Sequence, residues 1–250
     1  MNSELNKLTS FDDWLLIPQY SEIRSRKEID TSVSLIKNNS EIAKLDIPII
    51  SSPMSSITEA YMSNAINHLG GLGIIHRYNT IAFQTKLLNF VYDTKIKSAA
   101  IGTNNDYKER LSSLANNGLK IVCIDVAHGD HILVRECIEF VKKEYPDIFI
   151  IAGNVATASG YKRLSSWGAD AVRVSIGSGS ICTTRIQTGH GVPTIHAIFE
   201  CQKVKEDILH EGSNPAYIIA DGGIKNSGDI VKSLAAGADL VMLGSMLSGT

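Results

Sequence analysis

From residue 47 onward, short runs rich in apolar and β-branched residues alternate with stretches in which apolar residues recur at helical spacing. The runs predict eight strands, at residues 47–51, 72–75, 98–101, 121–125, 148–153, 171–175, 217–221 and 240–243. The stretches between them predict helices at residues 58–69, 81–91, 107–116, 131–145, 158–167, 194–209 and 227–236. Strands separated by helices pair in a parallel sheet, and eight is the number that closes a barrel.

We therefore predict an α/β fold, a (β/α)8 or TIM barrel, over residues 47–250. The length of 250 residues suits one such domain. An open doubly wound sheet is the alternative, but no G-x-G-x-x-G motif follows the first predicted strand. The chain stops at Thr250, a few residues after the last predicted strand, so we expect a barrel truncated there, without its eighth helix.

Residues 1–46 have no such rhythm and are predicted to be an irregular N-terminal arm. Within it, Phe11-Asp-Asp-Trp-Leu-Leu-Ile-Pro18 is an apolar patch that we expect either to plug one end of the barrel or to reach a neighbouring subunit. Residues 1–7 lack the layout of a signal peptide, and no apolar run approaches the ~18 residues of a membrane span. We expect a cytoplasmic protein that binds no membrane.

The overall composition excludes some further classes of function. A net charge of −2 gives no sign of nucleic-acid binding. The four cysteines (Cys123, Cys137, Cys182 and Cys201) have no metal-binding spacing and are expected to be reduced thiols. The histidines are not spaced as zinc ligands either.

Polar residues follow most of the predicted strands, at the end of a barrel where function gathers. One loop stands out, Ile176-Gly-Ser-Gly-Ser-Ile-Cys-Thr-Thr-Arg185. Its glycines allow close approach to a ligand, and a cysteine becomes a nucleophile where its surroundings favour the thiolate. A flexible loop with an incidental thiol is the alternative.

Two short glycine turns, Asp221-Gly222-Gly223 and Gly244-Ser245, follow the last two strands. Their N–H groups are suited to a phosphate, and the Asp221 carboxylate to a ribose diol. Asp125 is a candidate for a second ribose and Asn154 for an amide. All of these are equally compatible with tight turns or satisfied buried polar groups. The residues alone therefore predict a nucleotide-handling barrel enzyme with a candidate cysteine nucleophile.

Several stretches together resemble a known family. They are Phe11-Asp-Asp-Trp-Leu-Leu-Ile-Pro-Gln-Tyr20, Ser51-Ser-Pro-Met54, Gly70-Gly-Leu-Gly-Ile-Ile-His76, Asp125-Val-Ala-His-Gly129, Ala152-Gly-Asn-Val-Ala-Thr157, Gly177-Ser-Gly-Ser-Ile-Cys-Thr-Thr-Arg185, Ala220-Asp-Gly-Gly-Ile224 and Met242-Leu-Gly-Ser-Met246. Across residues 11–250 the chain resembles the inosine monophosphate (IMP) dehydrogenase / guanosine monophosphate (GMP) reductase family.

The resemblance implies a homotetrameric (β/α)8 barrel that acts at purine C2. In the dehydrogenase, Cys182 would attack C2 of IMP, hydride would pass to NAD, and hydrolysis would give xanthosine monophosphate (XMP). In the reductase, the same cysteine would displace ammonia from GMP, and NADPH would deliver hydride. The cofactor implied is therefore NAD or NADP, and the substrate IMP or GMP.

The resemblance also assigns site residues. Thr184 is implied to act with Cys182 in catalysis. The implied substrate contacts are Ser52, Met54, Ser180, Asp221, Gly222, Gly223, Gly244 and Ser245. Asp125, Asn154 and Gly177 fall where the nicotinamide half binds. Backbone carbonyls of Gly177, Gly179 and Cys182 resemble a potassium loop. Ser178 stands where proline is common in the family.

The direction of the reaction stays open at this point. Gly244-Ser245, Ile224 and the arm are dehydrogenase-like, whereas residues 188–193 leading to Glu200-Cys201 are reductase-like. The stretch from His76 to Ser98 has no room for a regulatory cystathionine-β-synthase-type insert. Family members continue with a C-terminal flap and a last helix that this sequence does not contain. We favour the dehydrogenase, with the reductase and an inactive nucleotide-binding barrel as alternatives.

Overall fold

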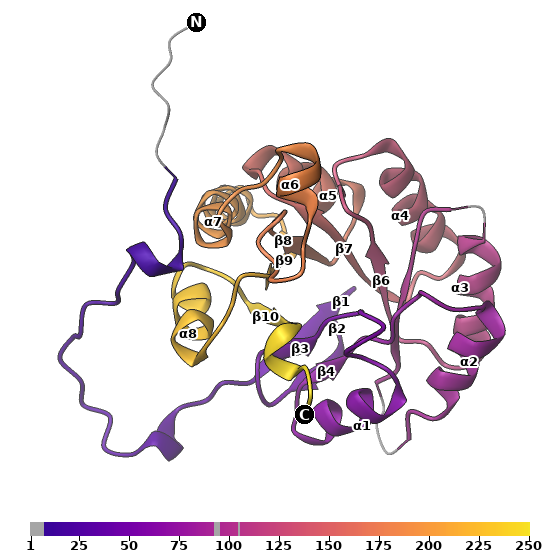
Figure 1. Ribbon diagram of the computed structural model, residues 1–250, viewed down its shortest axis with the longest axis horizontal. Helices are drawn as coiled ribbons and strands as arrows, with labels where there is room; N and C mark the ends of the chain where they lie inside the picture. Colours follow the sequence, from indigo (N-terminus) through magenta and orange to yellow (C-terminus); the bar gives the residue numbers. More distant parts are fainter. Residues whose placement is uncertain (1–7, 93–95, 105) are drawn as a thin grey trace, which may run out of the picture.

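Eight parallel strands surround a common centre and form a barrel (Figure 1). The structure is a computed structural model that describes residues 8–92, 96–104 and 106–250. Residues 1–7 of the predicted arm, with the argument about a signal peptide, lie outside the described residues, as do residues 93–95 before the third predicted strand. The strands are β3 (Ile49–Ser51), β4 (Leu72–Gly73), β5 (Ser98–Ile101), β6 (Ile121–Asp125), β7 (Phe149–Val155), β8 (Ala171–Val174), β9 (Tyr217–Asp221) and β10 (Leu240–Leu243).

The strand order is β4-β3-β10-β9-β8-β7-β6-β5, with parallel pairing throughout. One parallel bridge between Ile75 and Ala99 joins the two ends of this order and completes the ring. Across it, the Ile75 amide donates to the Ser98 carbonyl at 3.1 Å, and the Ala100 amide donates to the Ile75 carbonyl at 2.8 Å. The predicted (β/α)8 barrel is confirmed, and its thinnest seam lies between β4 and β5.

Helices surround the barrel on its outside, and the seven predicted helices are all present. They are α1 (Ala60–His68), α2 (Ile81–Asn89), α3 (Tyr107–Asn116), α4 (Ile132–Glu144), α5 (Ala158–Trp167), α7 (Thr194–His210) and α8 (Ser227–Ala235). Their ends follow local chemistry: the Thr157 hydroxyl accepts from the Gly160 amide at the start of α5, and Gly168 ends it with a φ of 104°. A short additional helix, α6 (Thr184–Thr188), was not predicted.

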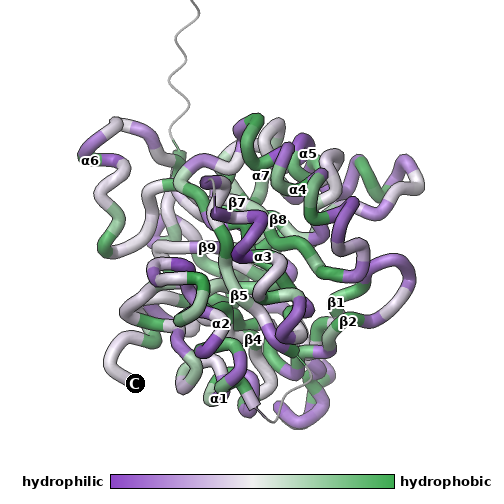
Figure 2. The backbone as a smooth tube through the Cα atoms, turned by 90° about the vertical axis from the view of Figure 1, so that its right-hand side faces the viewer, coloured by the Kyte–Doolittle hydropathy of each residue, from purple (hydrophilic) through white to green (hydrophobic). Residues whose placement is uncertain are grey.

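Apolar side chains fill two layers, one inside the barrel and one between the strands and the helices. The inner layer includes Ile50, Leu72 and Phe149, and the outer one includes Leu111, Ile138 and Ile198. In Figure 2 the strands are mainly hydrophobic, while hydrophilic segments lie around the outside. Strands buried on both faces explain why the sequence shows continuous apolar runs rather than alternation.

An antiparallel hairpin, β1 (Val33–Lys37) and β2 (Ser40–Leu45), closes the amino-terminal end of the barrel. Leu35 and Leu45 are buried in the inner apolar layer. Lys37 Nζ lies 2.7 Å from Asp170 Oδ2, and the Tyr217 hydroxyl donates to the Ser34 carbonyl at 2.9 Å. In side view the hairpin and α6 lie at opposite ends of the molecule (Figure 2). The prediction that residues 1–46 are irregular is wrong for this segment.

The apolar patch at residues 11–18 packs on the outside of the barrel. Phe11 is buried, and its carbonyl accepts from Lys232 Nζ of α8 at 2.8 Å. The rings of Trp14 and Phe199 of α7 are 5.1 Å apart. The prediction that this patch plugs the barrel is therefore wrong, because the hairpin does so. Its alternative role at a neighbouring subunit stays a prediction.

None of the helices within residues 8–92, 96–104 and 106–250 has both the length and the apolar character needed to cross a bilayer.

Candidate active site

The cysteine loop lies over the carboxyl end of β8 and is held by its own hydrogen bonds. An antiparallel bridge joins Ile176 to Val192. The Cys182 amide donates to the Gly179 carbonyl at 3.1 Å. The Ser178 hydroxyl donates to the Val192 carbonyl at 3.1 Å and accepts from the Arg185 guanidinium at 2.9 Å. Ser178 thus ties the two sides of the loop together.

Cys182 differs in its surroundings from the other cysteines. Its side chain is half-buried, and its sulfur lies 3.2 Å from the Thr184 hydroxyl oxygen. Cys123, Cys137 and Cys201 are buried, and burial raises the pKa of each of these thiols to about 12. A thiol must ionise in order to act as a nucleophile. Of the cysteines, Cys182 is therefore the candidate nucleophile.

A first pocket opens beside the loop, between the ends of β3, β9 and β10. The Asp-Gly-Gly turn touches the cysteine loop there: Gly222 has a φ of 98°, and a Cβ added to it would lie 3.1 Å from the Gly179 amide nitrogen. Glycine is required at this position by both conformation and space. The pocket brings together all the predicted substrate contacts: Ser52, Met54, Ser180, Asp221, Gly222, Gly223, Gly244 and Ser245.

A second pocket lies on the other side of the loop and is lined by Cys182 and Thr184 themselves. It contains the three residues predicted for the nicotinamide half, Asp125, Asn154 and Gly177. Through Ala127, Ile176 and Thr184 it adjoins a larger hollow of about 520 Å³ with mostly apolar walls. The candidate nucleophile therefore borders the second pocket, while its own loop lines the first.

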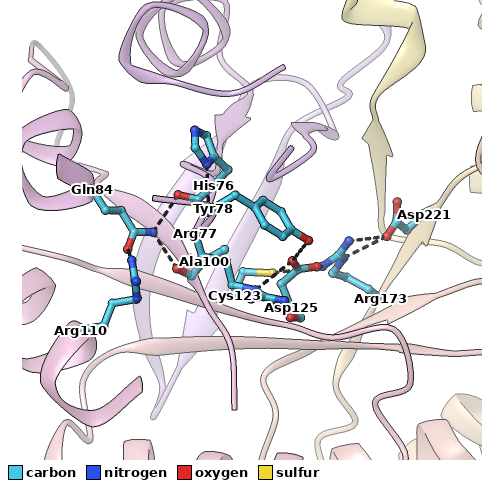
Figure 3. Close-up of polar contacts among 10 residues, drawn as sticks. All are labelled: His76, Arg77, Tyr78, Gln84, Ala100, Arg110, Cys123, Asp125, Arg173 and Asp221. Carbon is cyan, nitrogen blue, oxygen red and sulfur yellow. Dashed lines mark hydrogen bonds and ion pairs between the residues drawn. The ribbon is translucent and has the colours of Figure 1, made fainter. Parts of the chain in front are cut away.

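A buried arginine that was not predicted from the sequence connects the two pockets. Arg173, on β8, is 6% exposed. Its guanidinium lies 2.6 Å from Asp125 Oδ1 and 2.8 Å from Asp221 Oδ2 (Figure 3). Burial alone would lower the pKa of Arg173, but the two carboxylates raise it well above its ordinary value. A charged residue inside an otherwise apolar strand was the available signal, because such a charge must be paired.

The close-up also shows how Asp125 is held on its other side (Figure 3). The Arg77 side chain donates to Asp125 Oδ2 at 3.3 Å, and the Tyr78 hydroxyl lies 3.5 Å from the same oxygen. Burial and the Asp125 charge raise the pKa of Tyr78. Both residues line the second pocket, and neither was predicted. They follow β4, so their place was predictable but their role was not.

Asp221 is held through only one of its two oxygens. Oδ2 accepts from Arg173 Nε at 2.9 Å and from Asn154 Nδ2 at 2.7 Å. Within the described parts of the chain, Oδ1 receives no recorded hydrogen bond, and Asp221 lines the first pocket. A carboxylate fixed on one side with its second oxygen available is suited to accept hydrogen bonds from a ligand's hydroxyl groups.

Metal ligands of the usual type are not gathered at this site. In residues 8–92, 96–104 and 106–250, no cluster of three or more His, Cys, Asp or Glu is placed to hold a metal ion. The predicted potassium loop relies on carbonyls instead. One of these, Gly179, already accepts the Cys182 amide but keeps a second lone pair.

Residues 8–250 match the family model described as the IMP dehydrogenase / GMP reductase domain. The chain belongs to this family. The resemblance drawn from the sequence motifs is thereby confirmed, and membership of the family implies an oxidoreductase and a purine mononucleotide substrate.

Individual relatives agree with this membership. The chain is 36% identical to "Inosine-5'-monophosphate dehydrogenase" of Borreliella burgdorferi, with 98% of this chain and 72% of the relative covered. The protein of the same name from Cryptosporidium parvum is 37% identical, over 98% of this chain and 69% of the relative. The protein of the same name from Nitrosopumilus maritimus is 29% identical, over 99% of this chain and 76% of the relative. The last alignment spans 372 positions, more than this chain's 250 residues, so that relative carries residues within the matched region that have no counterpart here.

Proposed function

We propose that the chain is an IMP dehydrogenase-like enzyme that oxidises IMP to XMP with NAD through a covalent intermediate on Cys182. The observation that carries this proposal is the position of Cys182. It borders the second pocket, and its loop forms a wall of the first pocket together with the Asp221 and Gly244 turns. The relatives described above, all named IMP dehydrogenases, favour this direction of the family's chemistry.

In the proposed reaction the Cys182 thiolate forms a bond to C2 of the purine, and C2 loses a hydride. The dinucleotide, when bound, supplies the acceptor for that hydride. Water then attacks C2, the carbon–sulfur bond breaks, and the thiol is restored. The sum is IMP, NAD⁺ and water giving XMP, NADH and a proton. Thr184, 3.2 Å from the sulfur, is placed to orient the thiolate and the water.

The residues of the first pocket fit a purine mononucleotide. Backbone N–H groups at Gly223, Gly244 and Ser245 are proposed to hold the phosphate. The available Oδ1 of Asp221 is proposed to accept from the ribose hydroxyls. Met54 and Ser52 line the same pocket and are proposed to border the nucleotide, as Ser180 does from the cysteine loop.

The second pocket and its neighbouring hollow fit a dinucleotide. Asp125, Asn154 and Gly177 are proposed to hold the nicotinamide half, and the apolar hollow offers room for a further flat ring. Among the described residues that line this hollow, Asp130 is present and no Lys or Arg is. The dinucleotide is proposed to be NAD, as in the reaction above.

Three further features belong to the proposal. The chain is divided into an arm, residues 1–46, and a barrel, residues 47–250, with the hairpin packed against the barrel. It assembles as a homotetramer. Potassium is held by the carbonyls of Gly177, Gly179 and Cys182, which a comparison of rates in potassium and sodium buffers tests.

Nicotinamide absorbance tests the reaction directly. The parent chain and Cys182→Ala are incubated with IMP plus NAD, and separately with GMP plus NADPH. We expect absorbance to rise with IMP and NAD in the parent alone. A fall with GMP and NADPH would assign the reductase reaction instead. If calorimetry detects nucleotide binding but absorbance changes in neither mixture, the chain is an inactive nucleotide-binding barrel.

A further inference from the structure

Arg173 holds one carboxylate from each pocket. Its guanidinium contacts Asp125, which lines the second pocket, and Asp221, which lines the first. The side chains of Arg173, Asp125 and Asp221 are 7%, 13% and 12% exposed, respectively, so solvent screens these contacts weakly. A shift of either Asp125 or Asp221 therefore moves Arg173, and with it the partner of the other carboxylate.

The space around Arg173 leaves it little freedom to adapt. A Cβ added to Gly153 on the neighbouring strand would lie 2.6 Å from the Arg173 Cβ, so the two backbones are packed closely. On the far side, the guanidinium lies 3.5 Å from the buried Cys123 sulfur. The arginine is therefore fixed along its stem as well as at its head.

A second connection runs parallel to the first. Asn154 lines the second pocket, and its amide donates to Asp221 Oδ2 at 2.7 Å and to the Ser175 carbonyl at 3.0 Å. Asp221 is thus anchored wholly by groups that belong to, or lie behind, the second pocket. Asp221 itself lines the first pocket.

We infer that Arg173 is a positioning residue that couples the two pockets, so that a nucleotide in the first raises the affinity of a dinucleotide for the second. Hydrogen bonds from ribose to Asp221 Oδ1, together with exclusion of water, strengthen the pairing of Asp221 with Arg173. The arginine then holds Asp125 in a fixed position before the second ligand arrives. Because coupling between sites is reciprocal, the dinucleotide raises the affinity for the nucleotide by the same factor.

This inference rests on the proposed function, and binding in a chain that cannot react tests it. In the Cys182→Ala background, calorimetry gives the dissociation constant of NAD with and without saturating IMP, and of IMP with and without saturating NAD. For each ligand, the ratio is its dissociation constant without the other ligand divided by that with the other ligand. We expect the two ratios to be equal and to lie in the range of about 5- to 150-fold. A lysine at position 173 has a single ammonium group, which cannot hold two carboxylates as the forked guanidinium does. When Arg173→Lys is added, we therefore expect the ratio to fall to within about twofold of one.

Arg135→Lys is the matched control, because Arg135 pairs with Glu139 on the exposed face of α4. It should leave the ratio unchanged. Asp125→Asn, in the same background, supplies a second test if Arg173→Lys does not fold: it should weaken binding of IMP although Asp125 does not line the first pocket. If Cys182→Ala binds both ligands with a ratio of one, the coupling alone is overturned. An unchanged ratio when Arg173→Lys is added, or unchanged IMP affinity when Asp125→Asn is added, does the same. Failure of Cys182→Ala to bind either ligand overturns the proposed function.

Discussion

The Cys182 sulfur lies 3.2 Å from the hydroxyl oxygen of Thr184, two residues further along the chain at the first position of α6. The start of this short helix orients the threonine toward the sulfur. Neither residue is completely buried, so a ligand can reach both. The proposed roles of these two side chains lead to the first two predictions.

Thr184→Val should lower kcat by about 10²-fold, because the variant keeps the shape of the side chain and loses the hydroxyl that faces the sulfur. Steady-state rates with IMP and NAD measure this, and KM for IMP should change much less. Thr183→Val is the control, since Thr183 is exposed. An equal loss in both variants would point to a disturbed loop rather than to a role for the Thr184 hydroxyl.

A single thiol should react in the native chain. Cys182 is half-exposed, whereas burial raises the pKa of Cys123, Cys137 and Cys201 to about 12. Titration with a chromophoric disulfide at pH 8 should therefore count one fast thiol in the folded chain, none in Cys182→Ala, and four in the denatured parent. Saturating IMP should slow the fast reaction. Fast modification of a second cysteine would contradict the burial of the other three.

Gln84→Met should destabilise the chain by about 2–4 kcal/mol, because it leaves several buried polar groups without partners. Gln84 Nε2 donates to the carbonyls of His76 and Ala100 on either side of the thin β4–β5 seam, at 3.0 and 2.7 Å (Figure 3). Its Oε1 accepts from the buried Arg110 at 2.8 Å. Urea unfolding measures the change. Gln187→Met, at an exposed position of α6, should stay within about 0.5 kcal/mol of the parent.

The contact between the hairpin and the barrel should depend on pH through Asp170. Burial raises the pKa of Asp170, although Lys37 lies 2.7 Å away and opposes this. The folded chain therefore keeps the proton to a higher pH than the unfolded chain. The contribution of Asp170 to the free energy of unfolding is greatest below the ordinary pKa of an aspartate. It falls as pH rises through the raised pKa that Asp170 has in the folded chain.

Urea unfolding of the parent and Asp170→Asn across pH 3.5 to 7 tests this. The free energy of unfolding of the parent should decline with rising pH relative to that of the variant. The double variant Lys37→Met/Asp170→Asn should be more stable than either single variant, because each single change leaves one buried charge without the opposite charge. A parent that gains stability relative to Asp170→Asn as pH rises would contradict the assigned direction.

The barrel itself was predictable because the strands are short, mainly apolar runs and the helices between them have a clear spacing. The hairpin was missed because its strands mix apolar with polar residues and so lack the continuous apolar runs of the buried barrel strands. The signal was Asn38-Asn39: both residues have positive φ, 50° and 60°, as a tight two-residue hairpin turn requires. Asparagine pairs between alternating runs indicate such a turn.

The candidate site was predictable at the ends of strands and unpredictable within them. Asp125 and Asp221 end their strands and Asn154 is the last residue but one of β7, where parallel topology brings them to one face. Arg173 lies inside a strand, and only the register of β8 between β7 and β9 brings it between two carboxylates. Arg77 and Tyr78 follow β4, but their contact with Asp125 depends on how the β4–β5 seam closes.

The covalent state of Cys182 during turnover tests the central claim most directly. The parent chain is mixed with IMP and NAD, quenched in acid, and analysed by mass spectrometry of the peptide that contains Cys182. The account predicts a purine nucleotide attached to this cysteine in the parent and absent from Cys182→Ser, which should be inactive. Turnover by the parent with no adduct on this peptide, together with activity in Cys182→Ser, would contradict it.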